Sequence, residues 1–205
     1  MNTSPKKYGW NNNQAEASHS YLVPGVLSLL HNAKGKKLID IGVGNGSLLP
    51  VWHEQGYDIS AFEPDSEGYK FALSNKFADV RQLGLGEGFP REWEASFDVA
   101  ICLEVVEHLF NAHVLPEACR YLLKKEGVLI VSTPYHGYLK NLALSVFNKW
   151  DFHHHPVRVG GHVKFWSKKT IVDLFDSHGF ELVEFKGVGR VPFVWKSMIL
   201  VFKPK

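Results

Sequence analysis

The chain has 205 residues, of which 45% are hydrophobic and 21% charged, and this size and composition favour one globular domain. Its net charge of +2 gives no field strong enough to predict a nucleic-acid partner. No run approaches the roughly 18 apolar residues of a membrane span, no signal-peptide core is visible, and Cys102 and Cys119 lie in apolar patterns typical of reduced, buried thiols, so we expect a cytoplasmic protein.

The N-terminal part of the chain predicts a helix over about residues 15–30, interrupted at Pro24 and Gly25. Residues 38–46, read Leu-Ile-Asp-Ile-Gly-Val-Gly-Asn-Gly, then predict a buried strand, a tight turn and the start of a second helix. Glycines in such a turn allow positive φ and close approach of a ligand, and the N–H groups of the helix start can bind it. The turn therefore predicts a site for part of a nucleotide.

The spacing of the turn decides between nucleotides. A dinucleotide-binding turn has the pattern G-x-G-x-x-G, whereas Ser47 stands where the third glycine would fall. The carboxylate of Asp40 would repel a pyrophosphate, whereas it can accept a hydrogen bond from an ammonium or an N–H group. The pattern favours an adenosine that carries a zwitterionic amino-acid tail.

The run from Asp40 to Gly46 resembles motif I of the class I S-adenosylmethionine-dependent methyltransferases. The resemblance implies an α/β, Rossmann-like class I methyltransferase fold: a mostly parallel seven-stranded sheet with an antiparallel last strand and helices on both faces. It implies S-adenosylmethionine as cofactor and S-adenosylhomocysteine as product. The cofactor contacts expected in the turn are Asp40, Gly42, Gly44 and Gly46.

The resemblance also implies that residues 1–34 cover the cofactor and touch the substrate. Aromatic and imidazole side chains in this segment are candidate lid residues, with ordinary packing as the alternative: Tyr8, Trp10, His19 and Tyr21. Of these, Tyr8 and Trp10 are expected to contact the substrate.

A second short strand ends at Glu63, which follows Gly42 by 21 residues. A carboxylate at about this spacing accepts hydrogen bonds from ribose hydroxyls in nucleotide-binding folds. We interpret Glu63 as the ribose ligand; the alternative is a surface acid in the turn before Pro64. A helix over about 66–77 and a weak strand over 80–83 follow. The loop over 83–90 shows no clear match to the aspartate that contacts adenine in many methyltransferases of this class, which leaves backbone groups of the loop for that role.

Residues 99–103, which follow Asp98, are a continuous apolar run, and the stretch 97–103 predicts a central parallel strand that ends at the site. The stretch from Cys102 to His108 resembles the Cys-x-Glu-x-x-Glu-His run of ubiquinone-biosynthesis O-methyltransferases. This resemblance implies that Leu103 contacts the cofactor and that Glu104 lies beside it. His108 is a candidate general base, and helix capping by Glu107 and His108 is the alternative.

The remaining elements complete one domain over residues 1–205. We expect a helix over 115–123, a strand over 127–134, a helix over 168–177 capped by Ser167, and strands over 180–185 and 197–202. The cofactor-binding core is then 38–134, an insertion on the substrate side is 135–165, and the C-terminal helix and strand pair is 166–205.

The insertion is where we expect the substrate to be recognised, with Tyr135 and Trp150 as candidate contacts. An amphipathic helix is predicted over 138–150, with apolar side chains on one face: Leu139, Leu142, Ala143, Val146, Phe147 and Trp150. This face packs on the domain, or it forms a lid for a greasy substrate or a shallow peripheral contact with a membrane. An exposed apolar face would suit a homodimer as well as a monomer.

Histidines in the insertion raise the question of a metal. Asp151 and His162 could join two of the residues His153–His155 around an ion, but consecutive histidines point in different directions, and we expect no metal. We interpret these side chains as a titratable wall of the substrate pocket. The candidate catalytic bases are His108, His136 and His162.

Together these patterns predict a methyltransferase that transfers a methyl group from S-adenosylmethionine to a small-molecule acceptor, by O-methylation of a quinone-like or phenolic hydroxyl or of a sugar. One alternative is an NAD(P)-dependent oxidoreductase, against which Asp40 and Ser47 argue. The other is a non-catalytic cofactor-binding or membrane-associated protein with the same fold.

Overall fold

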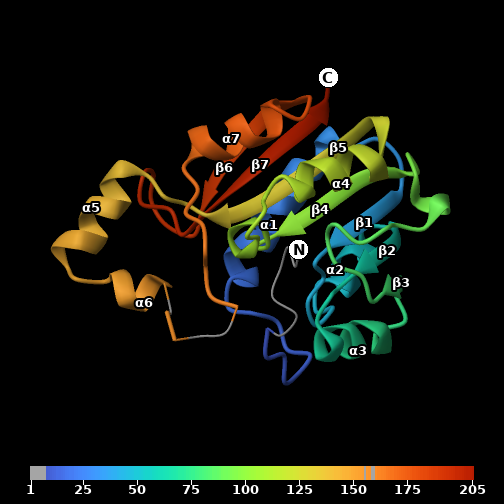
Figure 1. The fold of residues 1–205 in the computed structure, drawn as a ribbon, viewed down its shortest axis with the longest axis horizontal. Helices are drawn as coiled ribbons and strands as arrows, with labels where there is room; N and C mark the ends of the chain where they lie inside the picture. The colour runs from blue at the N-terminus through green and yellow to red at the C-terminus, as the bar shows by residue number, and fades with distance from the viewer. Residues whose placement is uncertain (1–7, 155, 158–159) are drawn as a thin grey trace.

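The computed structural model describes residues 8–154, 156–157 and 160–205. A seven-stranded sheet lies at its centre, in the order β3-β2-β1-β4-β5-β7-β6 (Figure 1). The strands are β1 (Lys37–Ile41), β2 (Asp58–Phe62), β3 (Ala78–Arg81), β4 (Phe97–Leu103), β5 (Leu123–Pro134), β6 (Phe180–Val188) and β7 (Ser197–Pro204). The pairs from β3 to β5 are parallel, and β7 is antiparallel to both β5 and β6. The predicted architecture is confirmed, including the antiparallel last strand.

Helices cover both faces of the sheet. The α-helices are α1 (His19–Leu29), α2 (Leu49–Glu54), α3 (Ser66–Ser74), α4 (Val114–Leu122), α5 (Tyr138–Val146), α6 (Trp150–His154) and α7 (Lys168–Asp176), with 3-10 turns η1 (Leu30–Asn32), η2 (Arg91–Trp93) and η3 (Val106–His108). Buried side chains of α1, α2 and α3 form one core cluster with the sheet, and those of α4 and α7 form the other.

The central strand β4 shows why the apolar runs are continuous. Val99 and Ile101 belong to the core on one face, and Ala100 and Cys102 belong to the core on the other. Because successive side chains of a strand point to opposite faces, a strand covered on both sides must be apolar at every position. This burial fixes the sheet that positions the site.

Two differences from the sequence-based prediction concern α1 and β5. Helix α1 continues through Pro24 and Gly25, so the predicted interruption is wrong. Gly25 serves close packing instead, because a Cβ added there would lie 2.6 Å from Cδ1 of Ile199 on β7. Strand β5 begins at Leu123, which pairs with Phe97, and not at residue 127.

Strand β6 forms one outer edge of the sheet, and its pairing with β7 shifts register between Leu182 and Glu184. The N-terminal end of α7 is capped as predicted, since the Ser167 side chain accepts a hydrogen bond from the Thr170 N–H. Among the described residues, none of the helices has the length and apolarity needed to cross a membrane.

The insertion forms α5 and α6, which extend away from the sheet beyond the end of β5 (Figure 1). The apolar face of α5 does not pack on the domain, so that interpretation is wrong: the residue of α5 that is buried is Lys140. The reason is a hydrogen bond on the opposite face, where Lys140 Nζ donates to the carbonyl of Lys196 at 3.0 Å.

Candidate functional site

A cavity of about 260 Å³ lies at the carboxyl ends of β1 and β4. These two strands are neighbours at the point where the strand order reverses, which is where open α/β sheets bind ligands. The cavity is lined by the glycine turn after β1, the end of β2, the segment after β4, the N-terminal segment and the last part of the insertion.

The three glycines of the turn all have positive φ, at 71° for Gly42, 59° for Gly44 and 74° for Gly46. Gly42 and Gly44 line the cavity, as predicted for ligand contact, and Gly46 is not among its lining residues. A Cβ at Gly46 would lie 2.6 Å from Cα of Ala72. Gly46 therefore allows the turn to pack against α3.

Asp40 is a buried carboxylate at the base of the cavity, 5% exposed. Its Oδ2 accepts a hydrogen bond from Trp52 Nε1 at 2.9 Å. Burial raises the pKa of Asp40 to about 7. A cationic group in the cavity would stabilise the ionised form, because an opposite charge nearby favours the carboxylate.

Glu63 is held between the turn and the end of β2. Its Oε2 accepts from the Gly44 N–H at 2.8 Å and its Oε1 from the Asp65 N–H at 2.9 Å. Burial raises the pKa of Glu63 to about 7. Each carboxylate oxygen keeps a second lone pair, so Glu63 retains the capacity to accept from ribose hydroxyls.

Residues 8–18, which we call the N-terminal strap, run along the cavity. The Tyr8 N–H donates to Asp65 Oδ2 at 2.8 Å, and Asn45 Nδ2 donates to the carbonyls of Asn12 and Gln14. The indole of Trp10 lies against the turn, since a Cβ at Gly44 would be 2.6 Å from its Cζ2. Tyr8, Trp10 and His19 line the cavity, and Tyr21 is outside the lining set.

The backbone bends sharply where β4 ends. Glu104 has φ of 54°, a left-handed conformation that is uncommon outside glycine. Its carboxylate accepts from the hydroxyls of Ser132, at 2.8 Å, and Ser197, at 3.2 Å, and burial raises its pKa to about 7. Leu103 and Glu104 both line the cavity.

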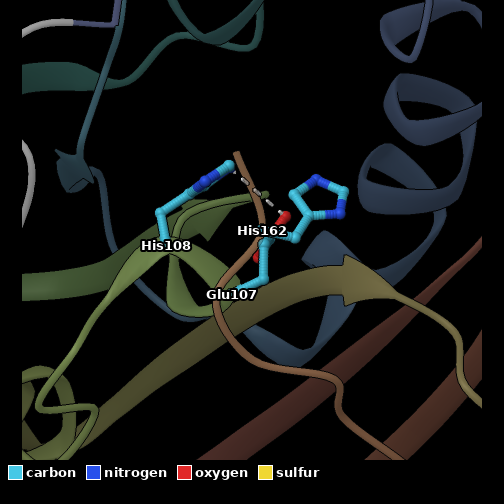
Figure 2. Close-up of side chains that lie close together, drawn as sticks. All are labelled: Glu107, His108 and His162. Carbon is cyan, nitrogen blue, oxygen red and sulfur yellow. Dashed lines mark ion pairs between the residues drawn. The ribbon is translucent and has the colours of Figure 1, made fainter. Parts of the chain in front are cut away.

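Glu107, His108 and His162 all line the cavity, and their side chains lie close together (Figure 2). The Glu107 carbonyl accepts from the N–H groups of Val163, at 2.9 Å, and Lys164, at 3.0 Å. These bonds tie the end of the insertion to η3. They explain how a residue 54 positions after His108 comes to lie beside it.

The hydrogen bonds of the cluster set its chemistry. His108 Nδ1 lies 3.3 Å from the Gly161 carbonyl, which can only accept, so this contact is a hydrogen bond when Nδ1 carries a proton; a neutral ring in that tautomer has its lone pair on Nε2. This Nε2 lies 3.9 Å from Glu107 Oε1, and the rings of His108 and His162 are 5.0 Å apart at their centroids. The Nε2 of His108 can therefore accept a proton or bind an ion.

The same cluster can hold a metal ion. One ligand atom from each of Glu107, His108 and His162 lies within 4.8 Å of the others. Glu107 is 1% exposed, and within the described part of the chain its Oε1 accepts no hydrogen bond. Burial, with the nearby Glu104, raises the pKa of Glu107 well above its usual range. A divalent cation would compensate a carboxylate buried in this way, so the donor set fits one.

This grouping was not predicted, because the sequence led us to consider His162 only together with residues 151–155 as metal ligands. Of those histidines, His155 lies outside the described residues. The signal was available in the adjacent Glu107 and His108, but nothing in the sequence placed His162 beside them. Leu85, which lines the cavity from the loop without an adenine-binding aspartate, was also not predicted.

Three other predicted residues lie outside the set that lines the cavity. His136 Nε2 is 3.2 Å from His153 Nε2, and burial lowers its pKa to about 4. Trp150 stacks on the His136 ring, and Tyr135 packs against Trp195. They sit where the chain leaves β5 toward α5 and α6, so the structure does not bring them to the predicted cofactor contacts.

Comparisons with known proteins agree with this geometry. The chain is 31% identical over 103 residues to ubiquinone biosynthesis O-methyltransferase of Idiomarina loihiensis, covering 48% of this chain and 42% of that protein. It is 26% identical over 167 residues to the human mitochondrial enzyme of the same name, covering 78% of this chain and 45% of that protein. The chain thus matches less than half the length of these two relatives.

Solved structures show the same fold. Magnesium protoporphyrin IX methyltransferase from Synechocystis superposes with a TM-score of 0.69 at 16% identity, over 95% of this chain and 90% of that one. A possible histamine N-methyltransferase from Thermotoga maritima superposes with a TM-score of 0.68 at 20% identity, over 89% of this chain and 87% of that one. The family profile described as methyltransferase domain matches residues 14–185. The chain therefore belongs to this family of methyltransferase domains.

Proposed function

We propose that the protein transfers a methyl group from S-adenosylmethionine to a hydroxyl of a small molecule, with a quinone-like or other phenol or a sugar as the acceptor class. The observation that carries the proposal is the arrangement of the cavity. Asp40, Gly44 and Glu63 line it together with Glu107, His108 and His162. Membership of the family and the ubiquinone O-methyltransferase relatives support the reaction and the oxygen acceptor.

The cofactor side matches the parts of the donor. Glu63 would accept from the ribose hydroxyls, and the carboxylate of Asp40 would attract the ammonium of the amino-acid tail. Leu85 and Phe62 offer apolar contact for the base. The sulfonium methyl would then point toward the cluster of Glu107, His108 and His162.

Methyl transfer from a sulfonium is an in-line displacement, so the protein must mainly hold donor and acceptor in line at about 3 to 3.5 Å. The acceptor hydroxyl must also lose a proton. His108 Nε2 carries the lone pair that would take it, and the Gly161 carbonyl keeps the ring in that tautomer.

A second way of activating the hydroxyl follows from the unmatched Oε1 of Glu107. A divalent cation held by Glu107, His108 and His162 would lower the pKa of a bound hydroxyl and orient it. Activity assays after EDTA treatment, with Mg²⁺, Mn²⁺ or Zn²⁺ restored separately, distinguish the two. If activity survives EDTA, His108 removes the proton without a metal. If activity is lost and one ion restores it, the cluster acts by binding that ion.

The test of the proposed function is calorimetric titration with S-adenosylhomocysteine, with NADH in parallel, for the wild type and Glu63→Ala. We expect binding of S-adenosylhomocysteine alone, weakened at least tenfold by the substitution, since two or more hydrogen bonds to a charged group are lost. Binding of NADH alone would overturn the proposal in favour of an oxidoreductase. Donor binding without turnover across an acceptor screen of phenols and sugars would favour a non-catalytic protein.

A further inference from the structure

Helix α5 carries its apolar side chains on the outside of the molecule. Tyr138, Leu139, Leu142 and Val146 are 79%, 50%, 47% and 68% exposed, and Phe147 directly after the helix is 70% exposed. At 100° per residue the first four fall within one 100° stripe. The stripe is continuous and faces solvent.

Other exposed apolar side chains lie on the neighbouring helix α6 and on the loop between β6 and β7. Phe152 on α6 is 77% exposed, and Val191 and Phe193 in the loop between β6 and β7 are 68% and 58% exposed. The loop is tied to α5 through the hydrogen bond from Lys140 Nζ to the Lys196 carbonyl. We call the set the outer apolar surface: Tyr138, Leu139, Leu142, Val146, Phe147, Phe152, Val191 and Phe193.

The orientation of α5 is fixed by polar contacts and not by its apolar residues. Lys140 is 6% exposed, and Asn141 Oδ1 lies 3.2 Å from His136 Nδ1. Burying a lysine is costly, and burial lowers its pKa to about 8. A helix that buries its lysine and leaves a stripe of large apolar side chains in water is oriented for a surface outside the domain.

The charge around the outer apolar surface indicates which kind of partner it binds. Residues 135–167 contain one acid, Asp151, and residues 185–205 contain none. Lys149, Arg190 and Lys196 are exposed at its margins. A second copy of the chain would bring these cations together, which disfavours a symmetric dimer. A partner surface that is both apolar and negatively charged would match the exposed apolar side chains and the cations around them.

We propose that the outer apolar surface docks on a bilayer of anionic phospholipid. The apolar side chains of α5, α6 and the β6–β7 loop enter the boundary between headgroups and acyl chains, and Lys149, Arg190 and Lys196 meet the phosphates. The contact is peripheral. It does not depend on which acceptor the cavity takes.

The test is co-sedimentation of the full chain with vesicles of phosphatidylcholine alone and of phosphatidylcholine with phosphatidylglycerol, at low and high salt. We expect binding to the anionic vesicles that falls as salt rises. Leu142→Ser with Phe147→Ser should weaken it about tenfold or more, because apolar insertion is lost. Lys149→Glu should weaken it about fivefold or more, since one cation near such a surface contributes about 1 kcal/mol.

The matched control is Leu73→Ser with Phe77→Ser, at side chains 49% and 39% exposed at and just beyond the C-terminal end of α3, far from the insertion. This variant should bind vesicles as the wild type does, and circular dichroism shows whether each variant is folded. Wild type that stays in the supernatant, or a control that loses binding equally, would overturn the proposal. So would a dimer in light scattering that the Leu142 and Phe147 substitutions dissociate, because the surface would then be a subunit interface.

Discussion

Asp40 and Glu63 are two buried acids that line one cavity, and burial raises the pKa of each to about 7. Each has a hydrogen-bond donor fixed beside it, Trp52 Nε1 for Asp40 and backbone N–H groups for Glu63. Burial outweighs these donors, so without a ligand the ionisation of both acids opposes folding. The acids are retained at a cost in stability, as expected for groups that bind a partly cationic ligand.

This cost has a pH dependence that can be measured. The folded protein holds the Asp40 proton up to about pH 7, whereas the unfolded chain loses it near pH 4, so the free energy of unfolding falls as pH rises between these values. We expect Asp40→Asn to raise the free energy of unfolding by about 2 kcal/mol at pH 8 and to change it little at pH 4. Urea unfolding without cofactor at both pH values measures this. If the free energies of unfolding of the variant and the wild type differed equally at pH 4 and pH 8, this expectation would be contradicted.

His108 is the side chain whose role in turnover is most directly testable. His108→Ala removes the Nε2 lone pair in the cavity and should lower turnover by about 10² or more, the usual contribution of a general base. Affinity for S-adenosylhomocysteine should change less than about threefold, because His108 is not among the residues expected to contact the cofactor. His53→Ala, at an exposed position on α2, is the control. Unchanged turnover in His108→Ala would remove the residue from the mechanism.

Among single residues, the sequence was most informative where backbone conformation demands a residue type. Gly42 and Gly44 need positive φ, and Glu63 ends a strand at a fixed distance after them. His162 was proposed as a base, but its approach to Glu107 was not foreseen. That approach depends on two backbone hydrogen bonds across more than fifty residues, which no local pattern records.

At the scale of elements, the central strands lie close to where they were predicted, because continuous apolar runs mark strands covered on both faces. Helix α5 shows the limit of that reasoning. Its amphipathic pattern predicted a helix, but periodicity gives only the existence of an apolar face and not what covers it. The burial of Lys140 against the Lys196 carbonyl decided the orientation, and this contact joins residues 56 positions apart.

The contact between α1 and β7 gives a prediction at this scale. A Cβ at Gly25 would lie 2.6 Å from Ile199 Cδ1 and 3.0 Å from Val188 Cγ1, so Gly25→Ala should destabilise the protein by about 1 to 3 kcal/mol. Gly88→Ala is the control, because no atom lies within 4 Å of its added Cβ. Thermal unfolding compares the two. Equal melting temperatures would show that α1 shifts to accommodate the methyl group.

For the whole molecule, the position of the cavity follows from the strand order, because β1 and β4 are the neighbouring strands at which the order reverses. The segment that covers the cavity could be predicted only from the resemblance to the methyltransferases. The N-terminal strap crosses it through the bonds from Asn45 to the carbonyls of Asn12 and Gln14. The cavity volume of about 260 Å³ is at or below the lower end of the roughly 300 to 1,000 Å³ of most ligand sites. Cofactor exchange should therefore require the strap to move.

Asn45→Ala tests this motion. Loss of two hydrogen bonds that hold the strap should speed both association and dissociation of S-adenosylhomocysteine by about tenfold, with a smaller change in the equilibrium constant. Stopped-flow fluorescence measures both rates. Asn32→Ala, which removes a comparable pair of hydrogen bonds beside η1, should leave them unchanged. Rates that do not respond to Asn45→Ala would mean that the strap opens independently of these bonds.

The two edges of the sheet bear on how the protein behaves at high concentration. An exposed edge strand offers unpaired backbone groups to which another chain can add, the first step in many aggregates. Here β3 is four residues long, with Asp79 and Arg81 on it, and β6 carries Glu181, Glu184 and Lys186 and a register shift after Leu182. Charges and an irregular edge both oppose strand addition. The sheet is thereby protected against joining edge to edge with other copies.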